Sequence, residues 1–450
     1  MRDLSTIVKA YDVRGTVPDQ FDALIAHALG AAFARFAAAP ALVVGRDMRP
    51  SGVELGRAFT EGALAVGVDV IDVGLASTDL LYYAAGTLDV PGAMFTASHN
   101  PARYNGIKLC LSGARPIGQD TGLAEVRADA ERILAEGLPA AEVRGTLSHR
   151  DLLADYAAHL RGLVPGLDRV RPLRVVVDCG NGMGGLTVPA VLAGLPLKVV
   201  ELYFALDGSF PHHEANPIDP ATLVDLQARV RAEGADLGLA LDGDADRCFV
   251  VDERGEIVSP SALTALIAER ELLRVPGSTV IHNLITSRAV PEVVAQAGGT
   301  PLRTRVGHSF IKAEMARTGA VFGGEHSGHF YFREFWNADS GMLAALHVLS
   351  ALGLGDGPLS ALLARYDRYA QSGEVNSTVD DAAGRVAAVR SAYAGHPQDD
   401  LDGLTVDLGD GAWFNVRASN TEPLLRLNVE APAPAQMRRV RDEVLALLRA

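Results

Sequence analysis

The sequence predicts an α/β protein of three related mixed-sheet domains followed by a smaller C-terminal α+β domain. Three segments share one layout of strand, polar turn, helix and further strand, which favours parallel or mixed sheets. After about residue 371 the pattern changes to short strand-like runs with two helical stretches. The length of 450 residues also suits several domains. We expect domains at 1–150, 151–254, 255–370 and 371–450.

The individual elements follow from apolar spacing and turn residues. In the first three domains we expect strands at 41–44, 92–95, 173–177, 237–241 and 278–281, and helices at 21–39, 53–66, 119–130, 151–164, 183–193 and 290–296. In the last domain we expect strands at 375–379, 404–408, 413–416 and 425–429, and helices at 381–393 and 435–448. The Ala-rich segment 21–39 places its apolar residues at helical spacing, so it faces a core.

Composition narrows the class of protein. A hydrophobic content of 48% with 21% charged residues is typical of a globular chain. The formal charge of −14 argues against a nucleic-acid surface. We find neither an apolar leader nor a run of about 18 apolar residues, so we expect a cytoplasmic protein without a membrane span. Cys110, Cys179 and Cys248 lie far apart, which predicts buried reduced thiols rather than disulfides or a metal site.

Three aspartates at alternate positions form the most informative motif. Asp242, Asp244 and Asp246 follow the apolar run 237–241. Carboxylates packed at a strand end repel one another unless a cation neutralises them. Along an extended strand the outer two would lie about 13 Å apart, so a shared Mg²⁺ requires the backbone to curl. The alternatives are a solvated acidic turn or an EF-hand loop, but the strand-like run 247–251 is incompatible with an EF-hand.

Other polar loops also follow predicted strands. Ser98, beside His99, is a candidate nucleophile, although serine and histidine are common in turns. Lys108 can move a proton or hold a phosphate, and the alternative is a surface lysine on a hairpin. The loop 417–423 combines a guanidinium with hydroxyls and an amide, which suits a phosphate dianion, and the alternative is an ordinary turn. A serine centre and a separate phosphate loop suggest a substrate handled at two phosphate positions.

Seven motifs in order resemble those of the α-D-phosphohexomutase family, and most closely its phosphomannomutase branch. They lie at 9–15, 45–47, 96–101, 242–247, 307–308, 324–329 and 417–423 and cover nearly the whole chain. The resemblance implies four domains in a heart-shaped molecule with a central cleft. It also implies a reaction that interconverts mannose 1-phosphate and mannose 6-phosphate through a phosphoserine and a hexose 1,6-bisphosphate, which serves as intermediate and activator.

The resemblance assigns roles to particular residues. Ser98 would be the phosphoserine and, with Asp242, Asp244 and Asp246, would bind Mg²⁺. Arg247 and Arg14 would lie near the transferred phosphoryl group, and Lys108 would assist proton transfer. The full expected set is catalytic Ser98, Lys108, Arg247, Arg14 and His99, and substrate-binding Tyr11, Gly307, His308, Glu325, Ser327, His329, Arg417, Ser419, Asn420 and Thr421. The partners would be small sugar phosphates, with the chain as a monomer or homodimer.

Specificity follows less directly from these residues. Glu325 and Ser327 would contact sugar hydroxyls that mannose and glucose share, so we expect some activity on glucose phosphates. Ile285 stands where related dual-specificity enzymes carry a lysine, and Arg288 is a candidate substitute. Alternatives are a phosphoglucomutase or a phosphoglucosamine mutase, although Ala245 and His326 disfavour the latter. A metal-dependent sugar-phosphate hydrolase and a non-catalytic binding protein are the alternatives from other classes.

Overall fold

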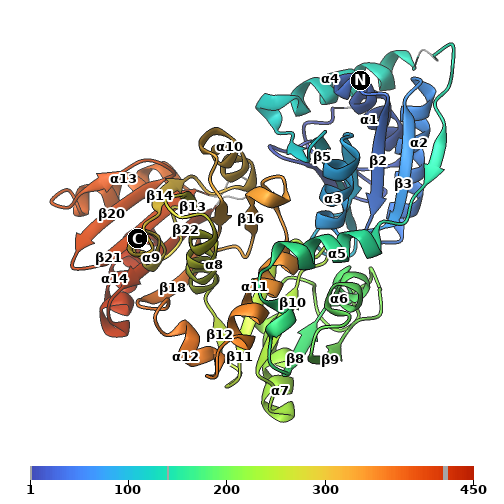
Figure 1. Ribbon diagram of the computed structural model, residues 1–450. Coiled ribbons are helices and arrows are strands. Elements are labelled where there is room, and N and C mark those ends of the chain that lie inside the picture. Colours follow the sequence, from blue (N-terminus) through green and yellow to red (C-terminus); the bar gives the residue numbers. More distant parts are fainter. Residues whose placement is uncertain (1–2, 139–140, 419–423) are drawn as a thin grey trace. The chain divides into compact units, whose positions relative to one another are not determined.

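The computed structural model describes residues 3–138, 141–418 and 424–450 of the chain. These residues form two compact units. The first contains the chain up to Val258 together with Ser327–Leu362, and the second contains Ser259–His326 together with Leu363–Ala450. Figure 1 gives the order of the helices and strands along the chain.

The N-terminal domain is built on a mixed sheet with the strand order β1-β5-β4-β2-β3-β7, and β6 pairs with β5. Strand β2 runs parallel to β3 and β4, whereas β5 runs antiparallel to β4 and β1. The strands are β1 (Val13–Thr16), β2 (Ala41–Arg46), β3 (Asp69–Leu75), β4 (Gly92–Phe95), β5 (Tyr104–Leu111), β6 (Arg115–Pro116) and β7 (Leu147–His149).

Helices cover both faces of this sheet. Helices α1 (Ala23–Ala37), α2 (Ser51–Ala65) and α4 (Leu123–Glu136) share one apolar core, to which β2 contributes Leu42 and Val44. Helix α3 (Thr78–Leu88) contacts the same strands from outside that core (Figure 1). Helices α1 and α2 pack closely because Gly30 and Gly62 carry no side chain: an added Cβ would lie 2.0 Å from a backbone oxygen of the other helix at either position.

The second domain has a sheet in the order β12-β11-β10-β8-β9, which is parallel between β8 and β10 and antiparallel between β10 and β11. All residues of β10 and β11 are buried. The elements are α5 (Leu153–Leu163), β8 (Leu173–Asp178), α6 (Gly184–Leu192), β9 (Leu197–Leu202), α7 (Val224–Glu233), β10 (Leu237–Leu241), β11 (Cys248–Asp252) and β12 (Ile257–Val258). The first unit also contains β16 (Phe330–Phe332), β17 (Ala338–Asp339) and α11 (Gly341–Gly353).

The second unit begins with a parallel arrangement in which β13 lies between β14 and β15. Its elements are α8 (Pro260–Arg274), β13 (Thr279–Asn283), α9 (Ala289–Gln296), β14 (Thr300–Thr304), α10 (His308–Thr318) and β15 (Phe322–Gly324). Helix α12 (Leu359–Leu363) ends where the C-terminal part of this unit begins.

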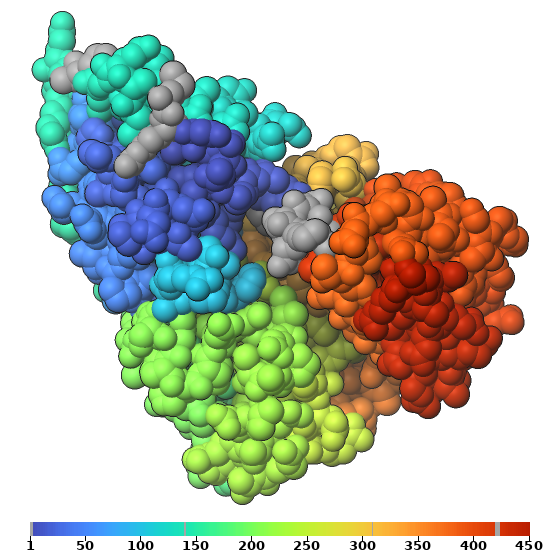
Figure 2. Space-filling model, turned by 180° about the vertical axis from the view of Figure 1, so that it is seen from behind, coloured from blue at the N-terminus to red at the C-terminus, as the bar shows by residue number. Residues whose placement is uncertain are grey.

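The C-terminal domain is an antiparallel sheet in the order β18-β22-β21-β20-β19, covered by two helices. The elements are β18 (Ala370–Thr378), α13 (Ala382–Ala392), β19 (Gln398–Asp399), β20 (Leu404–Gly409), β21 (Ala412–Ala418), β22 (Leu424–Ala431) and α14 (Pro434–Leu448). Helix α14 buries Met437, Val440, Val444 and Leu448 in the core of this domain. Its other face forms part of the domain's surface, in red in Figure 2.

The expected α/β class with three related mixed-sheet domains and a smaller α+β domain is confirmed. The helix expected at 119–130 was misplaced: a short 3₁₀ turn at Gln119–Thr121 precedes α4. Gly122 separates them with φ +130°, and an added Cβ there would lie 2.0 Å from the Phe36 ring. All three cysteines are buried and free, as expected. Among the described residues, no helix is both long enough and apolar enough to cross a membrane.

Candidate active site

The candidate nucleophile lies on the loop that follows β4. Ser98 is 2% exposed, and its backbone adopts the left-handed region with φ +49°. Its backbone N–H donates to Thr96 Oγ1 (2.8 Å), and its Oγ donates to Asp242 Oδ2 (2.8 Å). His99 Nδ1 lies 3.2 Å from the same Oγ. The loop therefore holds the serine oxygen against the acidic motif of the second domain.

The three aspartates form one buried cluster between β10 and β11. Asp242, Asp244 and Asp246 are at most 1% exposed, and each offers a carboxylate oxygen within 4.8 Å of the others. The backbone curls in the way that a shared cation requires, with Ala245 at φ +60°. Burial and the neighbouring charges of Asp246 and Asp244 raise the pKa of Asp242 well above its usual value. The predicted curled cluster is confirmed, and the solvated-turn alternative is wrong.

Lys108 partly neutralises this cluster from β5. Its Nζ donates to Asp244 Oδ2 (2.7 Å) and to Asp246 Oδ2 (2.5 Å). Burial would lower the pKa of Lys108, but the charges of Asp244, Asp246 and Asp339 outweigh it and raise that pKa. The side chain is therefore an ammonium at neutral pH. The alternative of a surface lysine on a hairpin is wrong.

The acidic cluster retains capacity for a hard cation. Asp244 Oδ1 and Asp246 Oδ1 are buried, and neither accepts a hydrogen bond from the part of the chain that the structure describes. Buried carboxylate oxygens without donors are costly unless an ion completes them. An all-carboxylate set of this kind fits Mg²⁺, which prefers oxygen ligands. The cluster can therefore hold a metal. Asp246, His329 and Asp339 form a second, overlapping group, but its imidazole makes it less suited to a hard ion.

Arg247 and His329 lie beside the acidic cluster, next to Asp242 and Asp246 respectively. Arg247 Nε donates to His329 Nε2 (3.2 Å) and lies 3.5 Å from Asp242 Oδ2. Because His329 Nε2 accepts, its proton sits on Nδ1, 3.0 Å from Ser327 Oγ. Burial and the charge of Arg247 lower the pKa of His329 to about 3, consistent with a neutral ring. Burial, Arg247 and Arg14 likewise lower the pKa of His99.

Arg14 reaches the same loop from β1. Its Nη1 donates to Asn100 Oδ1 (2.6 Å) and its Nη2 pairs with Asp12 (2.5 Å). Its Nε is buried and makes no hydrogen bond with described residues, so one donor remains for a ligand. Tyr11 precedes Asp12 in the sequence, and its side chain is partly buried. The first unit thus contains eleven of the expected residues: Tyr11, Arg14, Ser98, His99, Lys108, Asp242, Asp244, Asp246, Arg247, Ser327 and His329.

The remaining expected residues belong to the second unit, which is described by itself. Glu325 is 2% exposed, and one of its oxygens accepts from Asn283 Nδ2 (3.1 Å). Gly307, at φ +134°, precedes α10, which begins at His308. Arg417 is the penultimate residue of β21 and pairs with Glu374 (2.7 Å), while its buried Nε has no hydrogen-bond partner among described residues. Ser419, Asn420 and Thr421 lie outside the described residues.

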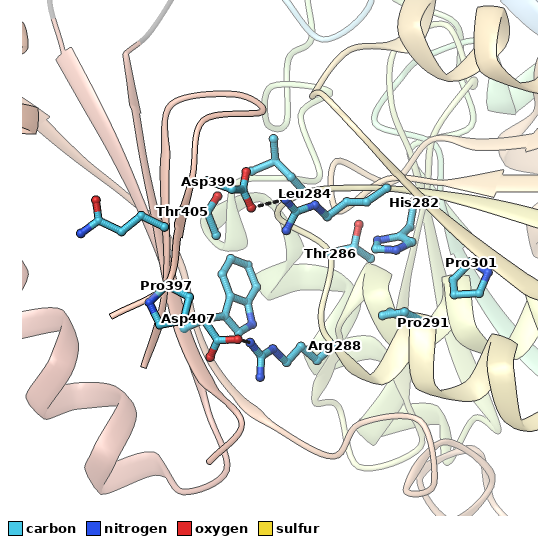
Figure 3. Close-up of a pocket in the computed structure, with 13 residues that line it drawn as sticks. His282, Leu284, Thr286, Arg288, Pro291, Pro301, Pro397, Asp399, Thr405 and Asp407 are labelled. Carbon is cyan, nitrogen blue, oxygen red and sulfur yellow. Dashed lines mark hydrogen bonds and ion pairs between the residues drawn. The ribbon is translucent and has the colours of Figure 1, made fainter. Parts of the chain in front are cut away.

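The positions that bear on specificity are also in this unit. Ile285 is 9% exposed and lines a small hollow with His326, Gln371 and Trp413. Arg288 lines a different cavity of about 450 Å³, shown in Figure 3, where its Nη2 pairs with Asp407 Oδ2 (2.6 Å). The guanidinium of Arg288 is therefore already paired with a carboxylate and lies apart from the hollow beside Ile285. This arrangement does not support Arg288 as the substitute for the missing lysine.

Sequence reasoning missed the residues that support this centre. Thr78 donates from its hydroxyl to Asp244 Oδ2 (2.5 Å) and from its backbone to the Asp244 carbonyl (3.0 Å). Next to it, Asp79 accepts hydrogen bonds from Tyr156 (2.7 Å) and Ser340 (2.6 Å), and also from Ser77. The fully buried Arg49 holds the Ser98 loop. Only Arg49 left a signal in the sequence, because it closely follows the matched motif at 45–47.

Comparison with known proteins agrees with this geometry. Models of the phosphoglucomutase/phosphomannomutase family match the chain in four consecutive stretches: alpha/beta/alpha domain I at residues 5–136, domain II at 154–255, domain III at 259–369 and the C-terminal domain at 374–447. The chain therefore belongs to the phosphoglucomutase/phosphomannomutase family.

Individual relatives span nearly the whole chain. A phosphomannomutase of Escherichia coli is 38% identical over 455 residues, covering 99% of both chains. A phosphomannomutase/phosphoglucomutase of Pseudomonas aeruginosa is 37% identical, covering 97% of this chain and 94% of the relative. The crystal structure of a phosphoglucomutase/phosphomannomutase family protein from Burkholderia thailandensis superposes with a TM-score of 0.88 at 33% identity, covering 99% and 97%. Together these findings show that the protein is an enzyme with phosphohexose mutase activity.

Proposed function

We propose that this mutase interconverts mannose 1-phosphate and mannose 6-phosphate, with glucose phosphates as a second pair of substrates. The observation that carries the proposal is the 2.8 Å hydrogen bond from Ser98 Oγ to Asp242 within the buried acidic cluster. That arrangement suits a serine that alternately carries and releases a phosphoryl group beside a cation. The mannose preference is supported by the similarity to the phosphomannomutase of Escherichia coli.

The proposed reaction moves one phosphoryl group in each direction. Phosphorylated Ser98 transfers its phosphoryl group to the free hydroxyl of the sugar monophosphate, so that the Ser98 Oγ–P bond breaks and a new O–P bond forms. The sugar hydroxyl loses its proton as the new bond forms and Ser98 Oγ gains a proton as it departs. Lys108 would give its proton to Ser98 Oγ and be reprotonated by the one that the hydroxyl releases. The resulting hexose 1,6-bisphosphate turns end for end, and Ser98 Oγ then takes the other phosphoryl group. Added hexose 1,6-bisphosphate activates the enzyme by phosphorylating Ser98.

The residues of the centre have distinct proposed roles. Asp242, Asp244 and Asp246 would hold Mg²⁺ together with the phosphate on Ser98. When bound, that ion supplies charge neutralisation to the phosphoryl oxygens. Arg247, beside Asp242, and Arg14, which holds Asn100, would neutralise further oxygen charge. Lys108 holds a proton beside the aspartates, which suits a group that gives a proton to the departing serine oxygen.

The remaining proposed roles concern the sugar and the second phosphate. Glu325 and Ser327 would accept and donate hydrogen bonds to sugar hydroxyls, while Tyr11, Gly307, His308 and His329 would line the sugar site. Arg417, Ser419, Asn420 and Thr421 would hold the phosphate that is not transferred. The Nε of Arg417, which makes no hydrogen bond within the described part of the chain, supports this role. We also propose the domain boundaries 1–150, 151–254, 255–370 and 371–450, and a monomeric or homodimeric enzyme.

A coupled assay tests the proposal. Purified protein with Mg²⁺ and a trace of hexose 1,6-bisphosphate is given mannose 1-phosphate or glucose 1-phosphate at equal concentrations, and both 6-phosphate products and free phosphate are followed. We expect a higher kcat/KM for mannose 1-phosphate and no phosphate release. A preference for glucose 1-phosphate would overturn the choice of sugar, and stoichiometric phosphate release would indicate a hydrolase.

The glucose reaction is the second candidate, and Ile285 bears on it. An isoleucine has no donor for a phosphate, so the contact that a lysine would make there is either lost or supplied by another residue. Replacing Ile285 with lysine adds a cation beside the hollow that it lines with Gln371. If this position tunes sugar choice, Ile285→Lys changes the ratio of the two kcat/KM values rather than both equally.

A further inference from the structure

Arg49 is the largest fully buried side chain of the first domain and lies outside the set of residues expected to react or to bind substrate. It follows β2 and is 0% exposed. A guanidinium without water is costly to bury unless all its donors are satisfied. An arginine has five N–H donors in a rigid planar fork. The partners of those five donors therefore show what the side chain does.

All five donors have partners, and four of these are carbonyl oxygens of the loop that carries Ser98. Nη2 donates to the carbonyls of Ser98 (2.9 Å) and Asn100 (2.6 Å). Nη1 donates to the carbonyls of Pro101 and Tyr104, both at 2.9 Å. Nε donates to the Asp47 carboxylate (3.2 Å), whose other oxygen accepts from the Arg49 backbone (2.9 Å).

This arrangement fixes the loop from behind. The loop leaves β4 and returns as β5, and it turns four carbonyl groups inward toward one point. The Pro101 carbonyl also accepts a hydrogen bond from the Tyr104 N–H (3.0 Å). Arg49 adds a charged donor to each of the four carbonyls from a single planar group. Its guanidinium also lies 5.0 Å from the centre of the Phe210 ring, which covers it on the side of the second domain.

The same loop places the serine in an unusual backbone conformation. Ser98 adopts φ +49°, which costs energy for a residue with a side chain and persists only where the surroundings enforce it. The Ser98 carbonyl that Arg49 holds is also the atom against which Gly243 of the acidic motif packs. Arg49 thus holds the backbone atom at which the Ser98 loop meets the acidic motif. Its own donors are all used by protein atoms, so it does not contact a phosphoryl group.

We propose that Arg49 is the positioning residue of the Ser98 nucleophile. It clamps the carbonyls of residues 98–104 so that Ser98 Oγ returns to the same place beside Asp242 after each phosphoryl transfer. The proposal rests on the proposed function only in taking Ser98 as the residue that is phosphorylated. A lysine cannot replace Arg49, because an ammonium has three donors and no planar fork.

The test compares Arg49→Lys with Arg35→Lys as a matched control. Arg35 belongs to the same domain and makes a partly exposed ion pair with Asp129 (3.4 Å) away from the loop. Three quantities are measured for each protein: kcat and KM for mannose 1-phosphate, the rate of Ser98 phosphorylation by hexose 1,6-bisphosphate followed by intact mass, and the midpoint of thermal unfolding. Rates are expressed per folded molecule.

We expect Arg49→Lys to lower kcat and the phosphorylation rate together by about 100-fold, since an error of about 1 Å in a reacting group costs that much. KM changes less than threefold, because Arg49 does not touch the substrate. Arg35→Lys changes neither rate. Near-normal rates per folded molecule in Arg49→Lys would refute the positioning role, as would a raised KM with an unchanged kcat.

A second variant gives a readout that a purely structural role would not move. In Arg49→Ala, added ethylguanidinium should restore kcat in a saturable way, whereas ethylammonium at the same ionic strength should not. Equal rescue by both ions, or rescue by neither in a folded variant, would overturn the proposal. If Arg49→Ala does not fold, the comparison of Arg49→Lys with Arg35→Lys decides. A wild-type protein that converts no hexose phosphate would instead refute the proposed function.

Discussion

Gly243 lies between Asp242 and Asp244 and packs against the loop that carries Ser98. We predict that the substitution Gly243→Ala, which adds one methyl group, moves Ser98 away from the acidic cluster. A Cβ added there would lie 2.4 Å from the Ser98 carbonyl oxygen and 3.3 Å from its carbonyl carbon. Ordinary contacts of a Cβ begin at 3.4 Å, so the two loops must separate by about 3.4 − 2.4 = 1.0 Å. The backbone of Gly243 is not in the left-handed region, so alanine introduces no strain of its own.

That separation falls directly on the proposed reaction centre. If the whole shift opened the Ser98 Oγ–Asp242 Oδ2 hydrogen bond, its length would grow from 2.8 Å to about 3.8 Å, beyond hydrogen-bonding range. A displacement of about 1 Å at a reacting group costs about 100-fold in rate. We therefore expect Gly243→Ala to lower kcat by about 100-fold, with a loss of about 1–3 kcal/mol in the free energy of unfolding from overpacking.

The coupled mutase assay and urea unfolding measure these two effects. Gly162→Ala is the matched control, because Gly162 lies on α5 with no atom within 4 Å of an added Cβ. An alanine in that helix should stabilise the protein by about 0.5–1 kcal/mol without changing kcat. A Gly243→Ala variant with kcat within threefold of the wild-type value would refute the reasoning that close approach of the two loops sets the rate.

Three further predictions concern charge. Lys108→Met removes the ammonium 2.7 Å from Asp244, so we expect at least tenfold tighter Mg²⁺ binding by calorimetry but slower turnover; unchanged Mg²⁺ affinity would contradict the proposed competition. Mg²⁺ added to chelator-treated protein should raise the midpoint of thermal unfolding, in line with about 2.7 kcal/mol at 100 times the dissociation constant, and Asp244→Asn should abolish the shift. Burial lowers the pKa of His282 from 6.5 to about 4, so folding favours its neutral form. As pH falls from 6.5 to 4, wild-type protein should therefore lose up to about 3 kcal/mol of stability relative to His282→Gln, measured by urea unfolding at each pH, and equal pH profiles would contradict this burial effect.

Much of the fold could be predicted because its signals are local. The apolar runs that became β8, β10 and β13 are short and bounded by turn residues, and the helical spacing of 21–39 predicted α1 closely. The error near Gly122 arose because a packing contact with Phe36, distant in sequence, requires glycine and divides the helical pattern. A local pattern contains no information about such a neighbour.

The candidate site was predictable only in part, for the same reason. Asp242, Asp244 and Asp246 are close in sequence, so their repulsion already predicted a curled cation site. Lys108 was left between a buried and a surface interpretation, because its two partners lie on a different domain more than 130 residues away. Thr78 and Asp79 act through hydrogen bonds to residues distant in the sequence and form no local pattern. Arg49 left only its place beside the motif at 45–47, which does not reveal the distant carbonyls that it holds.

The sequence by itself determined the fold class, the acidic cation site and the serine loop, since each depends on residues adjacent in the chain. Only the tertiary structure decided which groups neutralise and hold that site. It placed the Lys108 ammonium between two aspartates, fixed the neutral tautomer of His329 through Arg247, and directed all five donors of Arg49. These outcomes depend on burial and on distances between segments far apart in the chain, which are set when the domains pack and not by the order of the residues.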